Sequence, residues 1–132
     1  MPRLSPKSKG ELAELRFLCA AVSRRLVVAK PWGDNLPFDF LVGSRSPFYR
    51  VQVKSTSVRH CRGYHLSCFR PGTRRGYRRA EIDFVAAYVV PADAWYIIPC
   101  RALRRRKTLT LFPHRSVGRW ERFRGAWELL RR

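Results

Sequence analysis

Acidic residues are scarce in this chain, and the shortage dominates its charge. Nine Asp and Glu stand against 28 Lys and Arg among 132 residues, which gives a formal net charge of +19. A compact fold with this charge repels itself unless a polyanion or counterions compensate it. The imbalance therefore favours a protein that binds nucleic acid.

Long apolar runs are also missing. No stretch approaches the roughly 18 apolar residues of a membrane span, and no basic amphipathic helix with a wide apolar face stands out. The basic start of the chain is not followed by a signal-peptide apolar stretch. We therefore expect a cytoplasmic protein with no membrane partner. The length, with 45% hydrophobic residues, suits one core, so we expect a single domain over residues 1–132.

Cysteine is infrequent, and its spacing fits neither a disulfide framework nor a zinc site. The chain has four cysteines in apolar or mixed segments: Cys19, Cys61, Cys68 and Cys100. This scatter favours reduced, buried thiols. His60 and His65 lie near two of them, but no Cys-X2-4-Cys pair and no matching histidine pair with cysteines elsewhere is present. We therefore expect no zinc centre.

Lysine is rare as well, since arginine supplies 23 of the 28 positive charges. Arginine offers planar, two-pronged phosphate recognition, whereas lysine is a compact charge that can sit beside a reacting oxygen. Lys54 is the only lysine between Lys30 and Lys107. An isolated lysine in such a chain needs a chemical reason.

Helical spacing marks the first ordered segment. Ser8 is suited to cap a helix that runs through residues 10–22. Glu11 and Glu14 lie near its amino end, where negative charge suits the helix dipole. The apolar residues that repeat at helical spacing are Leu12, Leu15, Leu18, Cys19 and Val22.

Strand-like segments separated by turn formers fill the middle of the chain. They cover residues 26–29, 38–42, 49–55, 64–67, 82–90, 95–98 and 108–112. Strict alternation places Val51 and Val53 on one face of their strand, with Gln52 and Lys54 on the other. The segments 82–90 and 95–98 can form a hairpin. The rest of 57–80 is expected to be a basic loop, with helical segments at 101–105 and 120–130.

Four side chains could converge if these strands pair and the first helix packs beside them: Glu14, Asp39, Gln52 and Lys54. Two carboxylates and an amide oxygen are hard ligands suited to magnesium. Lys54 lies on the same strand face as Gln52 and could hold the attacking water or steady developing negative charge. The set therefore predicts a metal site with a charged partner.

These residues resemble the PD-(D/E)XK nuclease superfamily, and within it most closely the group I intron-associated endonucleases. The resemblance runs over nearly the whole chain and rests on motifs that are individually short but occur in order. They are KGELAE at 9–14, PFD at 37–39, VQVK at 51–54, IDFVAAY at 82–88 with WYIIP at 95–99, and WELL at 127–130, which looks like a closing helix.

The resemblance implies a mixed α/β fold with a restriction-endonuclease-like core, in which helices flank a central mixed sheet. It implies metal-assisted hydrolysis of DNA phosphodiester bonds, with Mg²⁺ as cofactor and Mn²⁺ as a substitute. Asp39, Gln52 and Lys54 then correspond to active-site positions, with Glu14 as the helix carboxylate and Glu11 as the alternate. Double-stranded DNA is the expected partner, and a homo-oligomer, dimer or tetramer, would let so small a domain cut both strands.

Two departures from the superfamily pattern leave alternatives open. Phe38 separates the proline from the aspartate, which the superfamily tolerates because only the aspartate touches metal. Gln52 removes one negative charge from the site, although the intron-associated family itself has Gln at this place. A non-catalytic DNA-binding module on the same fold and a nuclease for branched DNA, like junction-resolving enzymes, remain alternatives. Asp39 and Lys54 could also form a structural ion pair.

Two basic clusters are expected to contact DNA phosphates. They are Arg74, Arg75, Arg78 and Arg79, and then Arg104, Arg105, Arg106 and Lys107. Trp32 and Tyr77 could stack on bases or fill packing gaps, and the sequence leaves both readings open.

Overall fold

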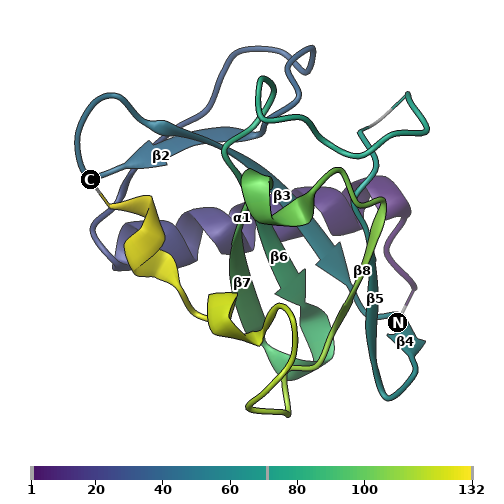
Figure 1. The fold of residues 1–132 in the computed structure, drawn as a ribbon. Helices are drawn as coiled ribbons and strands as arrows, with labels where there is room; N and C mark the ends of the chain where they lie inside the picture. The colour runs from purple at the N-terminus through teal and green to yellow at the C-terminus, as the bar shows by residue number, and fades with distance from the viewer. Residues whose placement is uncertain (1, 71, 132) are drawn as a thin grey trace.

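The computed structural model describes residues 2–70 and 72–131, so Pro71, in the predicted basic loop, lies outside the described residues. The chain begins with a long helix, α1 (Pro6–Ser23), which lies behind the strands in Figure 1. The strands that follow are β1 (Val27–Ala29), β2 (Phe40–Gly43), β3 (Tyr49–Thr56), β4 (Arg59–His60), β5 (Gly63–Ser67), β6 (Phe84–Val89), β7 (Ala94–Pro99) and β8 (Thr108–Leu111). The short helical turns are η1 (Val90–Ala92), α2 (Cys100–Leu103), η2 (Glu121–Phe123) and η3 (Trp127–Leu130).

The central sheet has the strand order β1-β2-β3-β6-β7. Strands β3 and β6 pair in parallel, and the other neighbours pair antiparallel. The predicted hairpin is confirmed, because β6 and β7 pair from Phe84↔Pro99 to Val89↔Ala94. A smaller sheet has the order β4-β5-β8. The mixed α/β fold expected for this chain is therefore confirmed.

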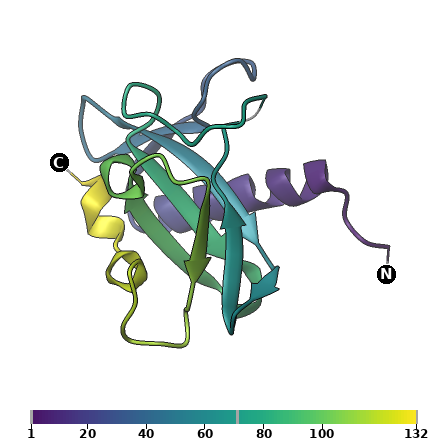
Figure 2. The same ribbon diagram turned by 45° about the vertical axis from the view of Figure 1, so that its right-hand side comes forward.

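The two faces of the central sheet bury different layers. On one face, Phe84 and Ala86 of β6 and Ile97 of β7 pack against α1. Val51 and Val53 of β3 lie on the same face. On the opposite face, the strand residues between them pack against the small sheet and the segment around η2. Figure 2 shows α1 crossing one side of the sheet while β5 and β8 cover the other. Val51 and Val53 thus point toward α1, which confirms the predicted alternation along β3.

Helix α1 starts earlier than predicted and buries a different face. Ser5, not Ser8, is the N-cap, and its hydroxyl accepts a hydrogen bond from the backbone N–H of Ser8 at 3.1 Å. Pro6 occupies the first turn, where its missing N–H costs nothing. The first turn contains no acidic residue, so the predicted dipole role for the glutamates at 11 and 14 is wrong.

The predicted Leu and Val stripe of α1 is not the buried one. Ala13, Phe17 and Ala21 are buried against the sheet, whereas Leu15 and Val22 are 60% and 54% exposed. Both sets have helical spacing, so periodicity alone could not choose between them. The small alanines let the helix backbone approach the sheet closely.

The helical segment predicted over residues 120–130 does not form, and its part that resembles a closing helix, residues 127–130, is a 3₁₀ turn. Two separate 3₁₀ turns, η2 and η3, occupy the segment. Gly125 lies between them with φ +66°, a left-handed conformation that interrupts a right-handed helix. The apolar spacing nevertheless serves burial, since Phe123, Trp127 and Leu130 are all in the core.

The four cysteines are free thiols, as expected, but only two of them are buried. Cys68 and Cys100 lie in the core, whereas Cys19 and Cys61 are exposed, which corrects the prediction of burial for those two. Within residues 2–70 and 72–131, no helix combines the length and the apolar character needed to cross a membrane.

Candidate active site

The open edge of β3 creates the candidate site. Strand β2 pairs with β3 only from Val42↔Tyr49 to Phe40↔Val51. One residue before β2, the backbone N–H of Asp39 donates to the carbonyl of Val51 at 2.9 Å. The Asp39 carboxylate then accepts the N–H of Val53 on Oδ2 at 2.8 Å, so a side chain takes the place of the next backbone pair. This fixes the carboxylate against β3 at the point where the two strands part.

A cavity of about 730 Å³ lies beside this edge, and all four predicted site residues line it. Glu14 comes from α1, Asp39 from the segment before β2, and Gln52 and Lys54 from β3. Glu11, the alternate helix carboxylate, does not line the cavity. The structure therefore favours Glu14 over Glu11.

The environment of Asp39 disfavours its negative charge. The pKa of Asp39 is raised from 3.8 to about 6, chiefly by burial and to a smaller extent by the nearby carboxylate of Glu14. The hydrogen bond from the Val53 N–H and the charges of Lys30 and Lys54 oppose this rise but do not cancel it. A buried carboxylate beside a second carboxylate is the arrangement that a cation relieves.

Glu14 is held by a lysine that the sequence analysis did not include in the site. Lys30 Nζ lies 2.8 Å from Glu14 Oε1, and its side chain is 59% exposed. The same ammonium lies 4.9 Å from the centroid of the Phe40 ring. An exposed pair of this kind contributes little stability, and it occupies one of the two carboxylate oxygens of Glu14.

Lys54 is half-buried and has no carboxylate within salt-bridge distance among the described residues. Its Nζ donates to the carbonyl of Phe69 at 3.3 Å and lies 5.5 Å from the centroid of the Tyr77 ring. Burial lowers the pKa of Lys54, while nearby Cys68 and Asp39 raise it. Lys54 and Asp39 thus shift each other's pKa, but they do not form the structural ion pair that was the alternative hypothesis.

The donor set fits a hard divalent cation. Asp39 uses Oδ2 for Val53, so Oδ1 remains available as a ligand. The amide nitrogen of Gln52 faces the carbonyl of Val53 at 3.4 Å, which leaves its oxygen available too. Together with Glu14 these are oxygen ligands of the kind that Mg²⁺ and Ca²⁺ prefer. Among the described residues, Glu14 and Asp39 are the only carboxylates that line the cavity, and Gln52 supplies a neutral third oxygen.

No zinc centre forms from the described residues. Among them, no group of three or more His, Cys, Asp or Glu side chains is placed to hold a metal ion. His60 and His65 lie with ring centroids 6.1 Å apart, and Cys61 contacts His60, but Cys68 is buried in the core.

Trp32 and Tyr77, left undecided from sequence, take opposite positions. Trp32 is fully exposed and fills no packing gap, whereas Tyr77 is 1% exposed and belongs to the core. The hydroxyl of Tyr77 has no hydrogen-bond partner within the described residues, although its ring faces Lys54. Tyr77 is therefore not a surface for base stacking.

The predicted basic clusters lie outside the cavity. Arg74, Arg78 and Arg79 are exposed, but Arg75 donates to both carboxylate oxygens of Glu81 at 2.7 and 2.9 Å. The second cluster lies on the exposed turn between α2 and β8, at residues 104–107. None of these side chains lines the candidate active site, and their contact with DNA stays a prediction.

Sequence reasoning missed several polar residues at the cavity, among them three with basic side chains. Lys9, Arg16 and His65 line it, and Lys30 contacts Glu14. Lys30 had a signal of its own, because it is also an isolated lysine in an arginine-rich chain. His65 had none, because it reaches the cavity only through the pairing of the small sheet.

Comparisons with known proteins agree with this geometry. The family model described as PD-(D/E)XK endonuclease matches residues 4–117. None of the curated proteins compared with the chain matches it. Among solved structures, a bacterial homing endonuclease, I-Ssp6803I, superposes with a TM-score of 0.80 and 26% sequence identity, covering 96% of this chain and 91% of that one. The restriction-endonuclease-like fold class is thereby confirmed, and the chain belongs to the PD-(D/E)XK endonuclease family.

Proposed function

We propose that the protein is a metal-dependent DNA endonuclease that hydrolyses phosphodiester bonds in the manner of a homing endonuclease. The observation that carries the proposal is the presence of Glu14, Asp39, Gln52 and Lys54 around one cavity at the open edge of β3. Membership of an endonuclease family supports the reaction, and the similar bacterial homing endonuclease supports DNA as the substrate.

Glu14, Asp39 and Gln52 would hold the metal, with Mg²⁺ as the ion and Mn²⁺ as a substitute. When bound, such an ion supplies Lewis acidity that offsets charge on the phosphate oxygens. The neutral amide of Gln52 keeps the ligand charge at two rather than three, so we expect weaker metal binding than three carboxylates would give. Lys30 competes for Glu14 and must share that carboxylate when the metal is present.

Lys54 acts on the water and the phosphate. Its ammonium donates hydrogen bonds to the attacking water and to the phosphate oxygen on which negative charge grows. Burial lowers the pKa of Lys54, so its proton moves more readily than that of an exposed lysine. The attacking water gives up one proton to solvent as its oxygen bonds to phosphorus. The bond from phosphorus to one sugar oxygen breaks, and that oxygen takes up one proton as it leaves, so one water is consumed and the protons balance.

The test is a magnesium-dependent cleavage assay on supercoiled plasmid and on a synthetic four-way junction. We expect Asp39→Ala and Lys54→Ala each to lower the cleavage rate by about 100-fold or more, in the range that positioned acid–base groups supply, while DNA binding survives. Glu14→Gln should also lower the cleavage rate while DNA binding survives. Glu11→Gln is its matched control and should cleave at the wild-type rate, because Glu11 does not line the cavity.

Three outcomes would change the proposal. Binding without cleavage on every substrate, including long genomic DNA that contains rare sequences, would identify a non-catalytic DNA-binding module. Cleavage confined to the junction would identify branched DNA as the substrate. Full activity of both Asp39→Ala and Lys54→Ala would move the active site elsewhere.

We further propose that the protein acts as a homo-oligomer, a dimer or a tetramer, because a chain with one such cavity cuts one strand at a time. Light scattering coupled to size exclusion measures this directly. A monomer that makes double-strand breaks with first-order dependence on protein concentration would contradict it.

A further inference from the structure

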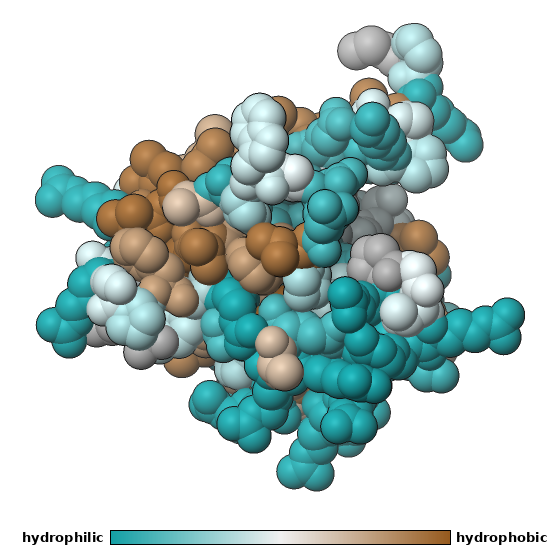
Figure 3. Space-filling model, turned by 90° about the horizontal axis from the view of Figure 1, so that it is seen from above, coloured by the Kyte–Doolittle hydropathy of each residue, from teal (hydrophilic) through white to brown (hydrophobic). Residues whose placement is uncertain are grey.

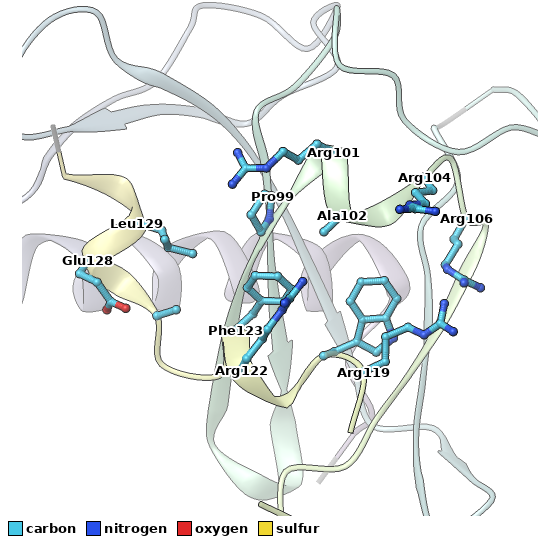
Figure 4. A pocket seen from close by; sticks show the side chains of 12 residues that line it. Pro99, Arg101, Ala102, Arg104, Arg106, Arg119, Arg122, Phe123, Glu128 and Leu129 are labelled. Carbon is cyan, nitrogen blue, oxygen red and sulfur yellow. The ribbon is translucent and has the colours of Figure 1, made fainter. Parts of the chain in front are cut away.

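A second cavity, of about 780 Å³, opens where α2 and the turn after it face the C-terminal turns η2 and η3. We call it the arginine cleft. Five arginines line it: Arg101, Arg104, Arg106, Arg119 and Arg122. Figure 4 shows their side chains arranged around the opening, with Glu128 at one side. Within residues 2–70 and 72–131, Glu128 is the only acidic residue that lines the cleft.

The positive charge of the arginine cleft is not compensated within the described residues. None of its five guanidinium groups forms a salt bridge or a side-chain hydrogen bond there, in contrast to Arg50, Arg70, Arg75 and Arg124, each of which pairs with a carboxylate. Side chains of like charge around one opening repel one another unless an anion binds between them. In Figure 3, hydrophilic side chains cover most of the lower half of the view, the side that faces the viewer in Figure 1.

The floor of the cleft favours phosphate over bases. Trp120 and Phe123 are 5% and 8% exposed, so their rings are not free to stack on a ligand. The guanidinium of Arg106 lies 6.0 Å from the centroid of Trp120, and that of Arg122 lies 4.7 Å from Phe123. These cation–π contacts restrain the two guanidinium groups before a ligand arrives. Arginine held in this way suits two-pronged recognition of phosphate oxygens.

The arginine cleft is separate from the candidate active site. The two cavities share no lining residue. Pro99, at the cleft, pairs with Phe84, whereas Lys54 pairs with Ala87, three residues further along β6. At roughly 3.3 Å per residue, the two levels of the sheet are about 10 Å apart along the strand direction. A phosphate in the cleft is therefore not the phosphate beside Lys54.

We propose that the arginine cleft binds consecutive phosphates of the DNA backbone away from the bond that is cut. The inference rests on the proposed function for the choice of DNA as the polyanion. It adds Arg101, Arg119 and Arg122 to the DNA-contacting surface, and it assigns them to backbone positioning rather than to base reading.

The experiment measures binding of the full chain to a 30-base-pair duplex by fluorescence anisotropy, without divalent metal, over a series of salt concentrations. The test variant is R101Q/R119Q/R122Q. The matched control is R25Q/R45Q/R62Q, which removes the same charge from exposed arginines that line neither cavity. Each phosphate neutralised adds about 0.9 to the slope of log affinity against log salt. We expect the test variant to lower the slope by about 2 to 3 and the affinity by about tenfold or more, and the control to change both much less.

Equal losses in the two triple variants would show that only net charge matters and would overturn the proposal. An unchanged slope in the cleft variant would overturn it as well. Arg119→Gln alone, which removes no internal contact, guards against misfolding of the triple variant and should lower the slope by about 1. The cleavage assay separates the two proposals. If the protein does not cleave DNA but the cleft variant lowers the salt slope, only the nuclease proposal is wrong. If the protein cleaves DNA normally but the cleft variant leaves the salt slope unchanged, only the cleft proposal is wrong.

Discussion

At the scale of single residues, Asp39 shows how the fold makes a carboxylate ready for a cation. Burial, and then the charge of Glu14, raises the pKa of Asp39 to about 6, above its ordinary value of 3.8. The folded, metal-free protein therefore binds the Asp39 proton more tightly than the unfolded chain does. Its contribution to stability falls as pH rises from about 4 to about 6 and stays unfavourable above that range.

This difference predicts a pH signature. With a shift of about two units, Asp39 should cost the metal-free protein on the order of 2 to 3 kcal/mol above pH 6. Asp39→Asn keeps an oxygen that can accept the Val53 N–H but cannot ionise, so it should be more stable than the wild type at pH 8 and equally stable near pH 4. Urea unfolding of the two proteins across this range measures the difference.

Magnesium supplies the control for this prediction. It should raise the urea midpoint of the wild type at pH 8, because a ligand that binds only the folded state stabilises it, and should leave Asp39→Asn nearly unchanged. If the stabilities of the two metal-free proteins change with pH in parallel, burial does not disfavour the charge of Asp39. Equal stabilisation of both by magnesium would contradict Asp39 as a ligand. The same titration implies that cleavage declines as pH falls below about 6.

At the scale of elements, the start of α1 was predicted at the wrong residue. Both Ser5 and Ser8 precede apolar helical residues, and either could cap. The structure selects Ser5 because Pro6 follows it in the first turn, and the Ser5 hydroxyl accepts the Ser8 N–H. Proline directly after a serine was a signal present in the sequence.

The cap predicts different effects for two chemically identical changes. Ser5→Ala should lower the free energy of unfolding by about 1 kcal/mol, because it leaves a helix N–H without its acceptor. Ser8→Ala should change it by a few tenths of a kcal/mol at most, because alanine is a good helix former within the helix. Thermal or urea unfolding of both variants measures this. A larger loss in Ser8→Ala than in Ser5→Ala would place the cap at the predicted residue after all.

The strands were predicted more accurately than the helices, for a physical reason. A strand's two-residue period places Gln52 and Lys54 on one face whatever the strand packs against. A helix offers several faces with similar apolar spacing, and only its partner decides which one is buried. In α1 the sheet accepts Ala13, Phe17 and Ala21 and leaves the Leu15 side exposed.

At the scale of the whole molecule, the net charge of +19 is only partly balanced by internal pairs. Salt bridges hold Arg50, Arg70, Arg75 and Arg124 against the few carboxylates, and the arginine cleft remains unpaired among the described residues. Such self-repulsion weakens a compact fold until ions screen it.

We therefore expect the melting temperature to rise when sodium chloride is increased from about 0.02 to 0.3 M, a range over which the screening length shortens several-fold. Differential scanning fluorimetry measures it. A short duplex DNA should raise the melting temperature further at low salt, because it binds the folded state. A melting temperature that falls with added salt would show that the internal ion pairs outweigh the repulsion.

The sequence by itself determined the order of the first helix and the main strands, the face of β3 that carries Gln52 and Lys54, the excess of positive charge and the motifs of an endonuclease family. These features are local or additive, so periodicity, composition and short patterns suffice to predict them. Tertiary structure alone decided that Glu14 rather than Glu11 reaches the cavity and that Asp39 replaces a backbone pair at the edge of β3. It also decided which arginines pair with carboxylates and which line the arginine cleft. These placements depend on strand order and on the helix face that packs against the sheet.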